Sequence, residues 1–217
     1  NVATGSVLPP PPGYTCAATA WEWIDATGGT LSSLTDDSSV SVTLPFSFRL
    51  YDTTYSTALI SSNGFVRLGT GSATDYSNVA IPSISEPNAY LAPFWDDLNP
   101  GAGGQVWTTT VGTAPTRRFV VSWNNVPIYG LAATDGVSVQ LVLDEGSRAF
   151  TLAWQDVTVG STAYNAGSSA TVGVEGGDGT FGTAVSYASA TLTALTARRC
   201  ADGSLDRKST RLNSSHT

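Results

Sequence analysis

The sequence predicts an all-β fold: a two-sheet antiparallel β-sandwich, jelly-roll-like, with little or no helix. Three observations predict it. Apolar and polar residues alternate over many short segments that turn residues separate at regular spacing. The body of the chain shows no sustained 3.6-residue period. Only 12% of the residues are charged, while Gly, Ser, Thr, Ala and Val abound, a composition that suits half-buried strands.

The length of 217 residues and the 41% hydrophobic content allow one large core, and all-β domains of this size often stay undivided. We expect a Pro-rich linker or arm at 1–13, a single sandwich domain at 14–205 and an artefactual tail at 206–217. Residues 206–216, DRKSTRLNSSH, resemble a translated sequencing-adapter oligonucleotide. The chain begins with Asn and contains no Met, so we interpret it as a mature chain or a piece of a longer reading frame.

The arm, NVATGSVLPPPPG, contains four prolines that cannot join a central ladder and that favour extended polyproline II geometry. A linker is the ordinary interpretation of such a segment. Strand donation is the alternative, in which Val2–Leu8 pairs with the exposed sheet edge of a neighbouring subunit in an extracellular filament.

Cys16 and Cys200 bracket the body of the chain. We predict a structural disulfide between them rather than a metal site, because residues 1–205 contain no His and four-coordinate zinc lacks its other ligands. Two unpaired buried thiols are the alternative, since the sequence does not show that the two residues meet. A disulfide implies an oxidising compartment, so we expect the protein outside the cell, secreted or on the cell surface.

The first strand signals lie at residues 20–26, AWEWIDA, and at residues 39–52, SVSVTLPFSFRLYD. Both segments alternate, and the second does so more cleanly. Pro45 within the second segment predicts an edge or a bulge, because proline cannot donate to a central ladder.

Residues 56–69, STALISSNGFVRLG, predict two strands or one bent strand about Ser62-Asn63-Gly64, since Asn-Gly supplies the positive φ values of a tight hairpin. Residues 91–100, LAPFWDDLNP, then combine an apolar strand, two adjacent carboxylates and a proline stop. A Gly-rich loop follows at 101–104, and we expect an ion or ligand site at this edge.

The second half continues with further strand candidates, separated by turn signals, at residues 105–112, 117–126, 137–146, 149–157, 170–176 and around 184–188 and 192–197. In total, roughly eleven or twelve strands are predicted, which is typical of a sandwich rather than of βαβ units.

Residues 1–205 contain no His and no Lys. This absence excludes Ser-His-Asp, Cys-His and Ser-Lys hydrolases, which need those side chains to take a proton. A carboxylate pair of the glycosidase kind is the catalytic scheme that survives, and it would draw on the Asp residues or on Glu22, Glu86, Glu145 or Glu175. Because carboxylates at sheet edges usually face water, we expect no enzyme.

Asp96, Asp97 and Asn99 carry the metal hypothesis. The turn after Asp97 could bring their oxygens together around Ca²⁺, a hard cation that takes six to eight oxygen ligands. In the structural alternative, one Asp caps the turn and the other pairs with Arg117 or Arg118. The structural interpretation is favoured, because the sequence has no DxDxDG loop.

The tryptophans carry the carbohydrate hypothesis. Trp107, Trp21 and Trp23 are the candidates for a sugar-stacking platform, and Trp107, followed by three threonines, is expected to be the most exposed. Trp123 and Trp154 lie in apolar strands and are predicted to be core.

The net charge of −7 argues against nucleic acid and anionic membrane surfaces as partners. No apolar run approaches the roughly 20 residues that span a bilayer, so we expect no membrane insertion.

Several blocks together carry a family resemblance: LPFSFRLYDTTYSTALISSNGFVRLG, IPSISEPNAYLAPFWDDLNP, VQLVLDEG and SSATVGVEGGDGT. The chain resembles, over about residues 20–195, a β-sandwich accessory domain of secreted bacterial proteins that is often attached to extracellular peptidases. It is more distantly similar to the nidogen-like extracellular domain. The resemblance implies a module without a catalytic motif that is displayed outside the cell.

The sequence therefore favours a non-catalytic accessory, adhesive or spacer module of a larger secreted protein. Its expected partners are the neighbouring domains of that protein and a surface glycan or protein. A carbohydrate-binding module is the first alternative, and a strand-donating filament subunit is the second.

Overall fold

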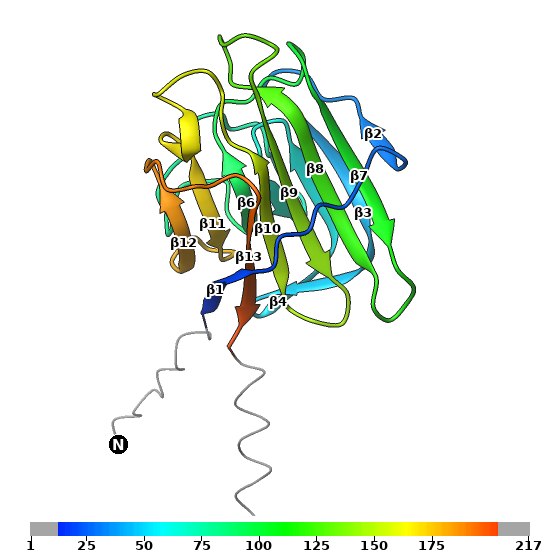
Figure 1. Ribbon diagram of the computed structural model, residues 1–217. Coiled ribbons are helices and arrows are strands. Elements are labelled where there is room, and N and C mark those ends of the chain that lie inside the picture. The colour runs from blue at the N-terminus through cyan, green and yellow to red at the C-terminus, as the bar shows by residue number, and fades with distance from the viewer. Residues whose placement is uncertain (1–12, 204–217) are drawn as a thin grey trace, which may run out of the picture.

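The computed structural model describes residues 13–203. The tail lies outside the described residues, as does the arm except for Gly13. The described chain forms thirteen strands and one turn of 3-10 helix at Asn165–Gly167, arranged as two antiparallel sheets (Figure 1). The predicted two-sheet sandwich is confirmed. No helix among these residues has the length and apolar character needed to cross a bilayer.

The first sheet has seven strands. In spatial order they are β1 (Tyr14–Thr19), β13 (Thr196–Asp202), β10 (Phe150–Asp156), β9 (Gly136–Asp144), β8 (Arg118–Pro127), β7 (Gln105–Val111) and β2 (Thr30–Ser32). The strands from β7 to β10 follow one another as neighbours, because short turns join them. This is the regular spacing that the second half of the sequence predicts.

The second sheet has six strands. They are β12 (Gly182–Tyr187), β11 (Thr171–Glu175), β6 (Tyr90–Trp95), β5 (Val66–Leu68), β4 (Thr53–Ser61) and β3 (Ser39–Leu50). The register of β3 against β4 shifts between Thr43 and Phe48, so Pro45 lies in a bulge, as predicted. The β4–β5 pair is a hairpin that closes over residues 62–65, with Gly64 at a φ of 75°.

The core lies between the sheets, and two tryptophans connect them. Trp123 and Trp154 are buried, which confirms both predictions. The Trp123 indole N–H donates to Ser61 O at 3.0 Å, and the Trp154 indole N–H donates to Pro93 O at 2.9 Å. Each indole therefore buries its ring and still satisfies its donor across the sandwich.

The strap, residues 20–29, crosses the outer face of the first sheet between β1 and β2 (Figure 1). The predicted strand at 20–26 is therefore wrong. The buried Gln140 side chain explains the difference, because it accepts from Ile24 N at 3.2 Å and donates to Ile24 O at 2.6 Å. A side-chain amide thus replaces a neighbouring strand as the partner of this backbone.

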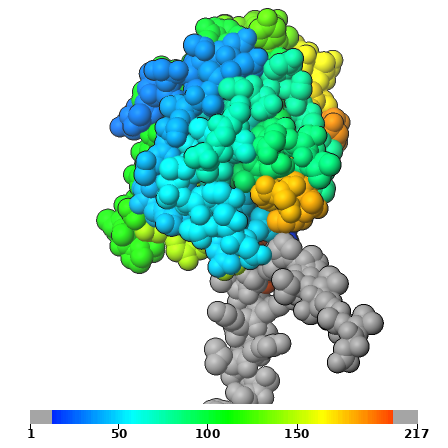
Figure 2. Space-filling model, turned by 180° about the vertical axis from the view of Figure 1, so that it is seen from behind, coloured from blue at the N-terminus to red at the C-terminus, as the bar shows by residue number. Residues whose placement is uncertain are grey.

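The cover loop, residues 69–89, spans the outer face of the second sheet between β5 and β6 (Figure 2). Phe65, Tyr90 and Trp95 pack beneath it, with ring centroids 4.9 to 5.9 Å apart. The Trp95 indole N–H donates to Asp75 O at 2.8 Å and so fixes the loop to the sheet. Both sheets are consequently covered on their outer faces, by segments in which no strand forms.

The sandwich has two poles. At the tether pole, Tyr14 pairs with Asp202, so both ends of the described chain leave the domain side by side. The loop pole lies at the opposite ends of the strands, where the turns at 33–38, 96–104 and 128–135 meet (Figure 1). The disulfide between Cys16 and Cys200, which the sequence predicts, joins β1 to β13 near the tether pole.

Candidate functional site

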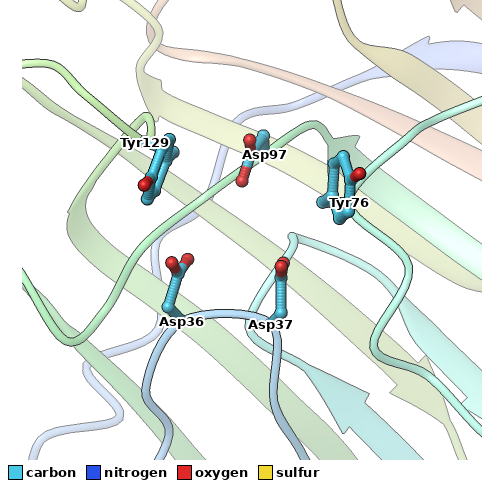
Figure 3. Close-up of a pocket in the computed structure, with 5 residues that line it drawn as sticks. All are labelled: Asp36, Asp37, Tyr76, Asp97 and Tyr129. Atoms are coloured by element: carbon cyan, nitrogen blue, oxygen red, sulfur yellow. The ribbon is translucent and has the colours of Figure 1, made fainter.

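The candidate site is an acidic pocket at the loop pole. Asp36, Asp37 and Asp97 each offer a carboxylate oxygen, and these oxygens lie within 4.8 Å of one another. Tyr76 and Tyr129 complete the lining of the pocket, which has a volume of about 340 Å³. Figure 3 shows the three carboxylates pointing toward one another, with one tyrosine on either side.

The turn before β3 presents Asp36 and Asp37. Ser38 shapes this turn, because its Oγ accepts from Thr35 N and donates to Thr35 O, both at 2.8 Å. Ser62 then holds the turn against the β4–β5 hairpin, since Ser62 N donates to Ser38 O at 2.8 Å and Ser62 Oγ accepts from Ser38 N at 3.0 Å. The two aspartates are therefore fixed beside that hairpin.

Asn63 connects the loops that supply the acids. It is buried, its Nδ2 donates to Asp37 Oδ1 at 3.0 Å, and its Oδ1 accepts from Leu98 N at 3.0 Å. The next residue, Gly64, lets the hairpin approach β6 closely, because a Cβ here would lie 1.8 Å from Phe94 O. The Asn-Gly pair that predicts a hairpin thus also supports the pocket.

Of the three clustered aspartates, Asp97 has the largest shift in pKa. Partial burial, together with the neighbouring carboxylates of Asp37, Asp36 and Asp96, raises the pKa of its carboxyl to about 6. No side-chain or backbone donor within residues 13–203 reaches this carboxylate. The pocket is therefore a site of uncompensated negative charge at neutral pH.

The adjacent Asp96 has a structural role. Its Oδ1 accepts from Asp97 N at 3.0 Å and its Oδ2 accepts from Ser169 Oγ, while burial raises its pKa. Asn99 caps the following turn, since its Oδ1 accepts from Ala102 N at 3.1 Å. Of the three predicted metal ligands, the structure brings only Asp97 into the acidic cluster.

The sequence interpretation missed Asp36, Asp37, Tyr76 and Tyr129. A usable signal was present for the first two, because Asp36-Asp37 repeats the adjacent-carboxylate pattern of the 91–100 segment. No local pattern marks the tyrosines. The alternative that paired one aspartate with Arg117 or Arg118 is wrong, because these arginines bind Glu145 and Glu22.

The tryptophans of the carbohydrate hypothesis lie at the outer face of the first sheet, and Trp21 is the exposed one, at 39%. Trp107 is only partly exposed, so the expectation that it is the most exposed is wrong. It packs with the strap against Val120 and Val142, and its indole N–H donates to Gln105 Oε1 at 3.2 Å. Trp23 is also partly buried.

Three of the four glutamates of the catalytic scheme form ion pairs: Glu22 with Arg118, Glu86 with Arg67 and Glu145 with Arg117. The Arg117 guanidinium lowers the pKa of Glu145 to about 2. Pairing with arginine lowers the pKa of both Glu22 and Glu145, so each of these two carboxylates is an unsuitable proton donor at neutral pH.

The fourth glutamate, Glu175, is buried beneath the cover loop. Its Oε2 accepts from Ser83 N at 2.9 Å, and Asn88, with its amide nitrogen turned toward Glu175, donates to Oε1 at 2.9 Å. Burial raises the pKa of this carboxyl to about 7. The contacts of Glu175 hold the cover loop on the sheet.

The acidic pocket could accept a cation. Carboxylate oxygens are the ligands that Ca²⁺ prefers, and the same oxygens could accept hydrogen bonds from a protonated amine. The flanking rings of Tyr76 and Tyr129, which are 53% and 56% exposed, offer π faces to such a group.

We expect D97N to stabilise the protein at neutral pH. The folded pKa of Asp97 lies above its unfolded value, so the native state binds the extra proton and loses stability as the pH rises from about 4 to 6. Asparagine removes this penalty, which we put at about 1 kcal/mol after allowing for solvent screening. Urea unfolding at about pH 7.5 should show the gain, and at about pH 4 it should vanish. Equal stability of both proteins at the higher pH would contradict the repulsion.

Two comparisons relate the chain to known proteins. Residues 13–207 match the family described as NIDO related. The chain is also 25% identical, over 139 residues, to alpha-tectorin of Mus musculus. That alignment covers 54% of this chain and 6% of alpha-tectorin, so the chain corresponds to a small part of that relative. No solved structure matches.

Proposed function

Because this chain belongs to the NIDO-related family, we propose that it is a non-catalytic adhesive module, displayed outside the cell by a larger secreted protein. The separation of its two poles carries the proposal. Neighbouring domains can attach only where the chain enters and leaves, at the tether pole. The acidic pocket with its two exposed tyrosines lies at the opposite pole, because the turns at 33–38, 96–104 and 128–135 supply Asp36, Asp37, Asp97 and Tyr129, and a binding surface there would face outward.

The disulfide supports the extracellular location. The bond between Cys16 and Cys200 would persist in an oxidising compartment and be reduced in most cytosols. The disulfide joins β1 and β13, the first and last strands of the described chain. Force applied through the two ends of the domain therefore passes through this bond, and the strands between the two cysteines resist unfolding. This property suits a module that holds two surfaces together.

The proposed lack of catalysis rests on the available side chains. Residues 1–205 offer no imidazole and no amine, and three of the four glutamates of that region are ion-paired. Assays of the full chain against aryl glycosides of the common sugars test this part. Hydrolysis that exceeds the rate without protein would contradict it.

Adhesion can be tested with beads that carry the full chain attached through its C-terminal end. We expect these beads to bind cell-envelope fragments of the producing organism, and a Y76A/Y129A variant to bind at least about tenfold more weakly. Y187A is the matched control, because Tyr187 is similarly exposed, at 46%, but lies in β12, outside the pocket. Equal binding by all three proteins, or binding no better than that of albumin-coated beads, would contradict the proposal.

Carbohydrate is the second candidate ligand. Exposed aromatic rings beside carboxylates provide both stacking surfaces and hydrogen-bond acceptors for sugar hydroxyls, and Trp21 offers another exposed ring. A glycan array probed with the full chain distinguishes the two surfaces. Loss of a signal in Y76A/Y129A assigns it to the pocket, whereas loss in W21A assigns it to the strap.

A further inference from the structure

Strand β1 is an unprotected sheet edge. Within residues 13–203 it pairs on one side only, with β13; its six residues carry no charge, and four of them are exposed. Sheet proteins usually blunt such edges with charges, prolines, bulges or short strands. The other edges here have these features: β2 has three residues, β3 contains Pro45 and Arg49, and the register of β12 shifts opposite Gly173. Only β1 among the described edges is suited to receive another strand.

The register leaves the backbone groups of Cys16 and Ala18 directed away from the sheet. Cys16 lies opposite Cys200 with a Cα–Cα distance of 4.0 Å, the short separation of a pair that exchanges no backbone hydrogen bonds. Alternate residues share this direction, so Ala18 also faces outward. The Tyr14 carbonyl fits the same pattern, because it accepts from Thr183 Oγ1 of β12 at 2.8 Å.

A groove of about 390 Å³ lies beside this edge, between the two sheets. Ala18, Trp154, Val185 and Leu192 form its apolar wall, and threonines and Arg198 line the remainder. The edges β1 and β12 meet at Tyr14 and diverge along the groove. A strand added to β1 would direct alternate side chains into this space.

We propose that Val2–Leu8 of a second copy of this chain pairs with the free edge of β1 and places every second side chain in the groove. These seven residues are uncharged and match the length of β1, which has six. They lie outside the described residues, before four prolines. Consecutive prolines favour a stiff extended connection of about 12 Å, which opposes a tight reversal onto the same molecule's β1. A neighbouring molecule is therefore the partner within reach.

The resulting contact is heterologous, because each copy gives one segment and receives another at a different surface. Such contacts close into rings or continue as filaments. The described chain begins beside the β1 edge, and no residue of β1 lines the acidic pocket, so assembly through this edge leaves the pocket free. The inference is thus independent of the adhesive function.

Light scattering of the full chain over a range of concentrations tests the proposal. We expect concentration-dependent oligomers, with an apparent Kd that rises at least about tenfold in A18P. This variant removes an outward N–H without removing a bond between β1 and β13. A18S, which keeps the N–H, is the matched control and should associate within about twofold of the parent. Unchanged thermal unfolding of both variants shows that the fold is retained.

Amide hydrogen exchange supplies the second measurement. The amides of Cys16 and Ala18 should be protected at high concentration and exchange freely on dilution, whereas that of Ala17, which faces β13, stays protected throughout.

A synthetic NVATGSVLPPPP peptide in excess should dissociate the oligomers. A monomer at every concentration, association unchanged in A18P, or protection independent of concentration, which would place the arm on its own β1, would each overturn the proposal.

Discussion

Replacing both cysteines, as C16A/C200A, is expected to lower the free energy of unfolding by about 4 to 5 kcal/mol. The bond joins residues 184 positions apart, so its loss frees almost the whole domain in the unfolded state. For a domain of this size, the melting temperature should fall by about 10 °C or more. Denaturant unfolding of the two proteins under non-reducing conditions measures the difference.

Two further measurements separate the stabilising effect of the cross-link from the loss of side-chain packing in the core. Cys200 is buried, so the alanine variant also loses some packing. Parent protein reduced after unfolding, and then refolded with its thiols blocked by a small reagent, gives an independent reference. Peptide mapping of the non-reduced parent should show the segments of Cys16 and Cys200 linked. A loss below about 1 kcal/mol in both measurements would show that the cross-link contributes little.

The N63D substitution is expected to cost about 3 kcal/mol at neutral pH. The change is nearly isosteric, but it removes the donor to Asp37 Oδ1 and places a fourth carboxylate against the acidic cluster. Burial and these neighbours raise the folded pKa of the new carboxyl above its unfolded value. The loss in free energy of unfolding caused by N63D should therefore reach its full size at about pH 7.5 and be smaller at about pH 4. Urea unfolding of the variant and the parent at the two pH values measures this difference.

N63A is the control for charge. It deprives Leu98 N and Asp37 of their partner without adding a carboxylate, so its cost, about 2 kcal/mol, should change less with pH. A cost that is independent of pH in both variants would mean that Asn63 acts by packing alone. Rescue of N63D by the additional D97N change would confirm that repulsion within the pocket is responsible.

The sequence could predict those features that depend on local pattern. The alternation of β3 and the bulge at Pro45 follow from the period of side chains along a strand. The burial of Trp123 and Trp154 follows from the apolar strands that contain them. The strap shows the limit of this reasoning. Residues 20–26 alternate like a strand, but a glutamine 116 positions beyond Ile24 satisfies the Ile24 backbone instead.

The candidate site was predictable only in part. The stretch at 91–100 correctly places a carboxylate at the pocket, yet neighbouring side chains in a turn diverge, and Asp96 reaches Ser169 while Asp97 faces the pocket. The two carboxylates that meet Asp97, those of Asp36 and Asp37, come from one turn about 60 positions earlier in the chain. Their approach depends on Ser62 and Asn63, whose contacts no local pattern encodes.

By itself, the sequence determined the sandwich and a body without imidazole or amine side chains. Side-chain period and composition are enough for these, because they act within a strand or need no geometry. The tertiary structure alone decided which aspartates meet, which sheet faces are covered and that β1 presents a free edge. These features arise where loops from distant parts of the chain come together, and there the contacts of single side chains select one arrangement among many.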